Sequence, residues 1–130
     1  MPTVYLDTSA LGRVLLKERE TASIQRELAN FGQHISSRLM RVELRRLGTS
    51  EGVLDVADAM LEPILLIPSD EEILTRAEVL PPTSVGTLDA IHLATALRVA
   101  EAGELDALMT YDKRLAEGAK EHGLTVLSPA

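Results

Sequence analysis

Four acidic residues, Asp7, Glu43, Asp89 and Asp112, occupy positions from which their side chains can reach one common site. Carboxylates that lie close together repel one another unless they are protonated or bridged by cations. Oxygen-rich clusters of this kind bind hard ions such as Mg²⁺ or Mn²⁺. Two such ions about 4 Å apart can clamp the oxygens of a phosphodiester while a metal-bound water attacks it. The four acids are therefore a candidate metal-dependent hydrolytic site.

Asp7 directly follows a short apolar run, Val4 to Leu6, that predicts a buried strand. Thr8 and Ser9 come next, and both are residue types that begin helices. In open α/β sheets, ligands bind where the strands end, because loops and helix starts converge there. Asp7 is therefore expected at the ligand-binding edge, although an acid in this position can equally be a simple helix cap.

Glu43 lies within a helix predicted over residues 38–47, four residues after Leu39. This spacing places the carboxylate along the buried edge of the helix, where it needs a partner. A second interpretation makes Glu43 a partly exposed acid that pairs with Arg46 one turn later.

Asp89 and Asp112 are both expected at the start of a helix. Asp89 falls in the first turn of a long helix predicted over residues 87–102, and Asp112 follows a strand predicted over 107–110 and opens the next helix. Taken singly, each can be a favourable charge at a helix N-terminus. Taken with the other two acids, they complete a four-carboxylate set at one edge of a sheet.

The remaining elements alternate between strands and helices. Helices are expected over 9–17, 21–30, 53–61, 69–80 and 112–122, and further strands over 34–36, 64–67 and 125–127. Gly48 to Gly52 is expected to end the helix that carries Glu43. Ser69 and Glu72 predict a capping box, and the aliphatic run 64–67 predicts a strand covered on both faces. This alternation predicts a single α/β domain over residues 1–130, with three layers and a central, mainly parallel β-sheet flanked by helices.

Composition limits the possible chemistry. The chain has no cysteine and only three aromatic residues, which excludes thiolate chemistry, sulfur-ligated zinc and aromatic platforms for stacking bases. It has no apolar run of membrane-spanning length and no signal-peptide pattern, so a cytoplasmic protein without a membrane partner is expected. The net charge is −7, which argues against a nonspecific coat of nucleic acid, but the basic residues concentrate in the first 46 positions.

A basic strip follows the predicted third helix: Arg38, Arg41, Arg45 and Arg46. Arginine suits the binding of phosphate or of a partner's carboxylates. Arg13 and Lys17 on the first helix can extend the strip. The alternative is a charged face that only meets solvent.

Four short blocks of sequence, in this order and spacing, resemble a known family. They are Tyr5 to Leu11, Val42 to Leu44, Leu88 to Ala96, and Thr110 to Leu115. Together they resemble the PIN-domain ribonucleases, and among them the VapC-type toxins of bacterial toxin–antitoxin pairs. The resemblance covers nearly the whole chain, and the acidic pattern is complete.

The resemblance implies roles for individual residues. It implies that Asp7, Glu43, Asp89 and Asp112 are the catalytic, metal-binding acids, and that Ser9 and Thr110 support them. It further implies an endoribonuclease that depends on Mg²⁺ or Mn²⁺, a homodimer, and a cognate antitoxin whose tail fills the cleft. Arg38, Arg41 and Arg45 are the candidate residues for contact with RNA or antitoxin.

Two other metal-dependent α/β folds do not match the sequence, and one alternative function stays open. A haloacid-dehalogenase-like phosphatase needs a second Asp two places after the first, where this chain has Ser9. A receiver domain needs its Asp after the central strand, where this chain has Pro68 and Ser69. The main alternative is a PIN-like module that binds RNA or protein without cutting it. His92, one turn after Asp89, can touch the site but is also a common type of hydrogen-bonded packing residue.

Overall fold

Five parallel strands form the centre of the molecule, in the spatial order β3-β2-β1-β4-β5. The computed structural model describes all of residues 1–130. Its strands are β1 (Thr3–Leu6), β2 (Gln33–Ser37), β3 (Leu65–Ile67), β4 (Ala107–Met109) and β5 (Val126–Leu127). The predicted three-layer α/β architecture is confirmed, and the sheet is parallel throughout.

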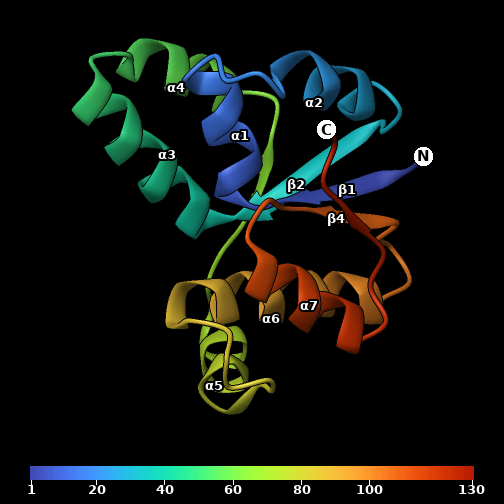
Figure 1. The fold of residues 1–130 in the computed structure, drawn as a ribbon. Coiled ribbons are helices and arrows are strands. Elements are labelled where there is room, and N and C mark those ends of the chain that lie inside the picture. The colour runs from blue at the N-terminus through green and yellow to red at the C-terminus, as the bar shows by residue number, and fades with distance from the viewer.

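Seven helices cover the two faces of the sheet (Figure 1). One layer holds α1 (Thr8–Leu15), α2 (Thr21–Leu28), α3 (Arg38–Glu51) and α4 (Leu54–Leu61). The other holds α5 (Glu71–Val79), α6 (Thr87–Glu101) and α7 (Lys113–Glu121). No helix combines the length and the apolar character that crossing a bilayer requires.

The central strand β1 contributes to both halves of the core, because successive side chains of a strand point to opposite faces. Val4 and Leu6 join the apolar cluster beneath α1 to α4, whereas Tyr5 joins the cluster beneath α6 and α7. All three side chains are fully buried. The residue that follows, Asp7, is thereby fixed at the end of the most deeply buried strand.

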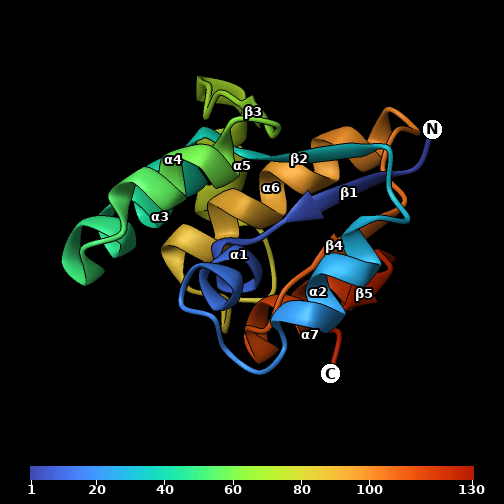
Figure 2. The same cartoon turned by 90° about the horizontal axis from the view of Figure 1, so that it is seen from above.

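The carboxyl ends of β1 and β4 lie side by side. Leu6 is in register with Met109, and the Asp7 N–H donates to the Met109 carbonyl at 3.0 Å. The tip of β1 lies between α1 and the start of α6 (Figure 2). Residues that follow β1 and β4 therefore share one edge with the N-terminal turns of helices from both layers.

Helix α3 is longer than the sequence suggested, and the expected break at Gly48 is wrong. The helix continues to Glu51 and ends at Gly52, whose φ of 71° is left-handed. Gly48 is buried against α4, and a Cβ at this position would lie 3.0 Å from the Ala57 Cβ. The glycine allows close packing of the two helices, and this packing outweighs its low helix propensity.

The apolar spacing of Leu39, Val42 and Leu47 predicts that these residues form the buried face of α3, and this prediction is wrong for Val42. Met40 and Leu44 are fully buried, whereas Val42 is 47% exposed. Glu43 is next to Leu44 and lies at the border between the two faces, with its side chain 25% exposed. Its carboxylate is therefore accessible from the edge of the sheet.

Two further local predictions are wrong. Strand β3 is an edge strand that pairs only with β2, and Leu65 is 55% exposed, so the aliphatic run is not covered on both faces. The cap of α5 is Asp70, whose side chain accepts from the Ile73 N–H at 3.0 Å. The Ser69 hydroxyl instead lies 3.1 Å from the Ser37 hydroxyl.

Candidate active site

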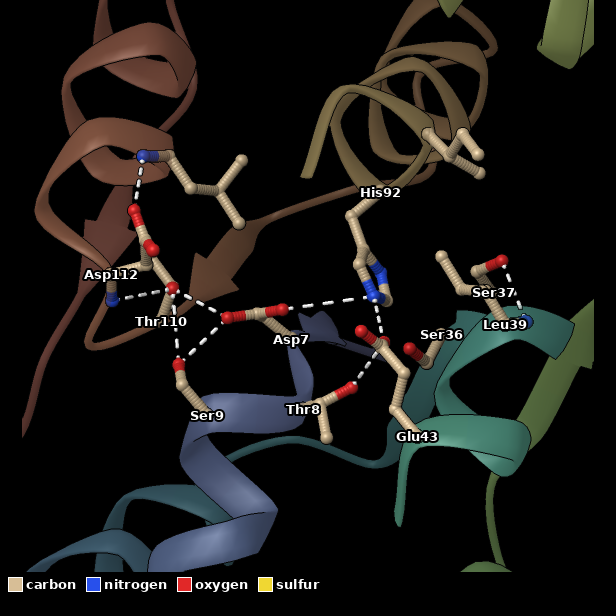
Figure 3. Close-up of polar contacts among 12 residues, drawn as sticks. Asp7, Thr8, Ser9, Ser36, Ser37, Leu39, Glu43, His92, Thr110 and Asp112 are labelled. Atoms are coloured by element: carbon tan, nitrogen blue, oxygen red, sulfur yellow. Dashed lines mark hydrogen bonds and ion pairs between the residues drawn. The ribbon is translucent and has the colours of Figure 1, made fainter. Parts of the chain in front are cut away.

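Asp7 lies at the centre of the site, immediately after β1, and is only 4% exposed. One oxygen of its carboxylate, Oδ2, accepts from the Ser9 hydroxyl at 2.7 Å and from the Thr110 hydroxyl at 2.8 Å (Figure 3). Its side chain makes no capping hydrogen bond to α1. The side chain thus faces Ser9 and Thr110 at the site and does not cap the helix.

Ser9 and Thr110 are themselves held by backbone groups. The Ser9 hydroxyl accepts from the Tyr111 N–H at 2.9 Å, and the Thr110 hydroxyl accepts from the Asp112 N–H at 3.0 Å. Because each hydroxyl has a single proton, these acceptor roles leave that proton for Asp7. The two predicted supporting residues therefore both orient the Asp7 carboxylate, one from α1 and one from the segment after β4.

Glu43 reaches the same edge from α3. Its Oε1 accepts from the Thr8 hydroxyl at 2.7 Å and lies 2.8 Å from the His92 Nε2 (Figure 3). Burial opposes ionisation of this group, but the hydrogen bonds from His92 and Thr8 bring the pKa of Glu43 below its ordinary value. Glu43 therefore has two partners, His92 and Thr8. The alternative pairing of Glu43 with Arg46 is not formed.

His92 is the residue at this edge whose position the sequence left open. Its fully buried ring lies on α6 between Tyr5 and two acids, with Nδ1 2.7 Å from the Tyr5 hydroxyl and Nε2 3.7 Å from Asp7 Oδ1. The spacing of one helical turn from Asp89 was the only signal in the sequence. The Tyr5 hydroxyl is 87 residues away along the chain, so no local pattern could reveal this contact.

Asp89 lies in the first turn of α6 and carries the clearest electrostatic sign of a crowded site. Burial, followed by the negative charges of Asp7 and Asp112, raises the pKa of Asp89 to about 6. Both burial and neighbouring negative charge disfavour the ionised form of a carboxyl group, and here burial is the larger cause. The structure thus brings Asp89 into the same electrostatic field as Asp7 and Asp112.

Asp112 follows β4 and begins α7. Its Oδ1 accepts from the Leu115 N–H at 2.9 Å, so the residue is a helix cap as well as a member of the acidic group. The N-terminus of α7 is a favourable place for a negative charge. This cap fixes the side chain at the border of the site (Figure 3).

The chemistry of these groups suits a hard divalent cation, since they offer carboxylate oxygens and a field that disfavours the ionised form of Asp89. In the arrangement described here, however, no three acidic or histidine side chains surround one point closely enough to share an ion. The four acids are gathered at one edge, and their role as a common ligand set stays a prediction.

The three candidate arginines differ in their availability. Arg45 forms a two-point ion pair with Asp58, at 2.7 and 3.3 Å, and the hydrogen bond to Asp58 raises the pKa of Arg45. Arg38 is exposed at the start of α3 and Arg41 is half-buried, and neither forms an ion pair. Arg38 and Arg41 are therefore more available to an anion than Arg45.

Comparison with known proteins places these features in a family. The family model described as PIN domain matches residues 4–121. Ribonuclease VapC47 of Mycobacterium tuberculosis is 38% identical, with 97% of this chain and 96% of that protein covered. Ribonuclease VapC46 of the same species is 36% identical over the full length of both chains. A solved toxin-antitoxin complex from Klebsiella pneumoniae matches with a TM-score of 0.73 and 22% identity, covering 98% of both chains.

Proposed function

The chain belongs to the PIN-domain family, and from this premise we propose that it is a metal-dependent endoribonuclease, the toxin of a toxin–antitoxin pair. The observation that carries the proposal is the gathering of Asp7, Asp89 and Asp112 at one edge of the sheet, where burial and then the charges of Asp7 and Asp112 raise the pKa of Asp89 to about 6. Burying several carboxylates together weakens the fold unless a cation relieves their repulsion. Relatives named ribonucleases at 36–38% identity support the same conclusion.

Asp7, Glu43, Asp89 and Asp112 are the residues that would hold Mg²⁺ or Mn²⁺. A divalent ion bound there supplies charge neutralisation for the phosphodiester and a water of lowered pKa. Asp7 is the most buried of the four, and Ser9 and Thr110 fix one of its oxygens. Ser9 and Thr110 act by orienting that carboxylate and need no contact with RNA.

The RNA backbone would approach along the exposed start of α3. Arg38 and Arg41 form no ion pair there, so their guanidinium groups can bind phosphate oxygens. Arg45 is less suitable because binding a phosphate would compete with Asp58. The net charge of −7 makes such a local basic surface necessary for holding RNA.

An antitoxin is the expected protein partner, since a matching solved structure is a toxin-antitoxin complex. A segment that covers the acids and the start of α3 would block both the proposed ion site and the proposed RNA surface.

The protein is further proposed to form a homodimer. Light scattering coupled to size exclusion should give about twice the 14.1 kDa of one chain, and the mass of a single chain would contradict the dimer.

The second candidate is a module that binds RNA or protein without cutting. The observation in its favour is that no three of the acidic or histidine groups converge on one point. In the nuclease, binding of an ion must draw these side chains together. Ion binding should then raise the melting temperature, whereas a pure binding module gains nothing from the ion.

The deciding experiment incubates the purified protein with a pool of structured and single-stranded RNA. The nuclease cuts RNA when Mn²⁺ or Mg²⁺ is present and stops in excess chelator, and new RNA ends map the sites of cutting. Binding of RNA or of a protein partner without any cutting, with each metal supplied, would favour the binding module. Cutting that persists in excess chelator would contradict the metal-dependent mechanism.

A further inference from the structure

His92 connects the two helical layers through a continuous chain of hydrogen bonds that the proposed mechanism does not yet use. Its Nδ1 lies 2.7 Å from the Tyr5 hydroxyl on β1, and its Nε2 lies 2.8 Å from Glu43 Oε1 on α3. The ring is fully buried and packs edge-on against Tyr5, with 5.8 Å between the ring centres and 80° between the planes. Such an enclosed ring can occupy few other orientations.

The partners of the two ring nitrogens define how the ring is held. The carboxylate of Glu43 only accepts hydrogen bonds, so the Nε2 beside it must be the donor. On the other side of the ring, the Tyr5 hydroxyl lies 2.7 Å from Nδ1. The phenol of Tyr5 thereby anchors the ring with Nε2 facing Glu43.

The hydrogen-bond donors at this edge contact only one oxygen of each carboxylate that they hold. Thr8 and His92 both donate to Glu43 Oε1, and none of the hydrogen bonds of the structure involves Oε2. At Asp7 the two hydroxyl donors likewise address a single oxygen, Oδ2. In both acids one oxygen is fixed by two donors while the other stays free of hydrogen bonds. This arrangement orients a carboxylate without using the oxygen that a ligand would need.

We propose that His92 is a positioning residue, which holds the Glu43 carboxylate at the acidic edge through Nε2–H, while the Tyr5 hydroxyl anchors the other side of the ring. The inference rests on the proposed metal-dependent nuclease function and adds how Glu43 is held in place. Glu43 needs such support because its long side chain extends from α3, and freezing its rotatable bonds on ligand binding would weaken affinity. Asp7, in contrast, projects directly from the end of β1.

The first test measures the tautomer itself by ¹⁵N nuclear magnetic resonance of protein labelled at histidine. The chain has three histidines, and the spectrum of His92→Gln identifies the His92 signals by their loss. The expected result is a proton on Nε2. An unprotonated Nε2 would overturn the inference, because His92 then cannot donate to Glu43.

The second test compares two substitutions that differ in where they place an amide donor. Gln has the reach to put its amide near the position of Nε2, whereas the shorter Asn reaches only the position of Nδ1. We expect His92→Asn to weaken Mn²⁺ binding, measured by calorimetry, about 10- to 100-fold, while His92→Gln largely restores it. Equal affinity of both variants and the wild type would overturn the inference.

The controls separate this inference from the proposed function. Thermal unfolding shows whether each variant folds, and Tyr5→Phe serves as a third variant that keeps the His92 ring and removes only the hydroxyl group that anchors it. If both His92 variants fail to fold, Tyr5→Phe decides, with weaker Mn²⁺ binding expected and unchanged binding overturning the inference. A wild type that neither binds Mn²⁺ nor cuts RNA would overturn the proposed function itself.

Discussion

At the scale of single residues, the carboxylates of the site differ in how well the fold stabilises their ionised form. Asp7 is supported by two hydroxyl groups, Glu43 by a hydroxyl and an imidazole, and Asp112 by the start of α7. Asp89 differs, because burial and the neighbouring charges disfavour its ionised form. Asp89 is therefore the acid whose behaviour should respond most strongly to pH and to metal.

The raised pKa of Asp89 predicts a specific dependence of stability on pH. In the unfolded chain this group ionises near its ordinary pKa of 3.8, and in the fold only near 6. Between these values the folded state holds the proton more tightly, so the contribution of Asp89 to stability is lost as pH rises through this window. Without metal, the melting temperature of Asp89→Asn relative to wild type should therefore rise from pH 4 to pH 7.

Scanning calorimetry with chelator at each pH measures this difference between the two proteins. Taking the difference cancels the effects of carboxylates that do not interact with Asp89. Added Mn²⁺ at pH 7 should restore the stability of the wild type and do little for Asp89→Asn. A difference between the two proteins that stays constant with pH would contradict the crowded site.

Thr110 offers a prediction about support for Asp7. Thr110→Val keeps the shape of the side chain but removes the donor to Asp7 and the acceptor for the Asp112 N–H. The expected cost is about 1–3 kcal/mol of unfolding free energy, because a buried N–H loses its partner. Cleavage should fall about 10- to 100-fold, as it does when outer supports of a metal site are removed.

Thr110→Ser is the matched control, since it retains the hydroxyl. It should keep most of the cleavage activity and most of the stability in a urea titration. If Val and Ser variants behave alike, the hydroxyl has no role at Asp7.

At the scale of secondary-structure elements, helix α3 is the element on which the site depends most, because it carries Glu43 and the exposed arginines. Its position is set by Gly48, where a Cβ would lie 3.0 Å from the Ala57 Cβ and 3.1 Å from the Leu54 Cα of α4. The backbone of α4 cannot move aside as a flexible side chain can. Close approach at Gly48 therefore holds α3 against its neighbour.

Gly48→Ala tests this packing. Alanine improves helix propensity by about 1 kcal/mol, but overpacking costs about 1–3 kcal/mol, so a net loss of stability is expected. Thermal unfolding should show a lower melting temperature than the wild type. Ser50→Ala, at an exposed position of the same helix, gains propensity without crowding and should be neutral or stabilising. Stabilisation by both substitutions would show that the contact at Gly48 is not tight.

Arg41 tests the proposed RNA surface on α3. Arg41→Glu should weaken binding of RNA or antitoxin without changing Mn²⁺ affinity, because Arg41 lies outside the group of acids. The neutral variant Arg41→Gln should lower the slope of log K against log salt by about 0.7 for single-stranded RNA. Arg19, which is exposed and outside the strip, provides the control as Arg19→Gln. Unchanged binding of both partners by Arg41→Glu would reject the surface.

The sequence predicted well those features that have strong local signals. Asp7 and Asp112 were placed correctly because each follows an apolar strand and precedes a helix start, and Asp89 because its helix begins after a loop rich in proline. The extension of α3 through Gly48 was missed, since it depends on packing against α4. The pairing of Arg45 with Asp58 and the contact of His92 with Tyr5 join residues from different elements, which periodicity along the chain does not report.

At the scale of the whole molecule, the parallel sheet positions the proposed hydrolytic edge. The sheet order 3-2-1-4-5 places β1 at the centre with β4 beside it, so the residues that follow them, Asp7 and Thr110, become neighbours. Helices from both layers then bring the remaining acids, Glu43, Asp89 and Asp112, to that edge. The architecture thus gathers charges that are far apart in the sequence, and their repulsion makes a cation the natural partner of the fold.

The most direct test of this account is RNA cleavage by the wild type and by Asp7→Asn, measured side by side with Mn²⁺ and with excess chelator. The substitution removes a central negative charge with almost no change of size, so the fold should persist, as thermal unfolding can verify. The account predicts that only the wild type with Mn²⁺ cuts RNA and that Asp7→Asn is at least about 100-fold slower. Full activity of a folded Asp7→Asn protein would contradict it.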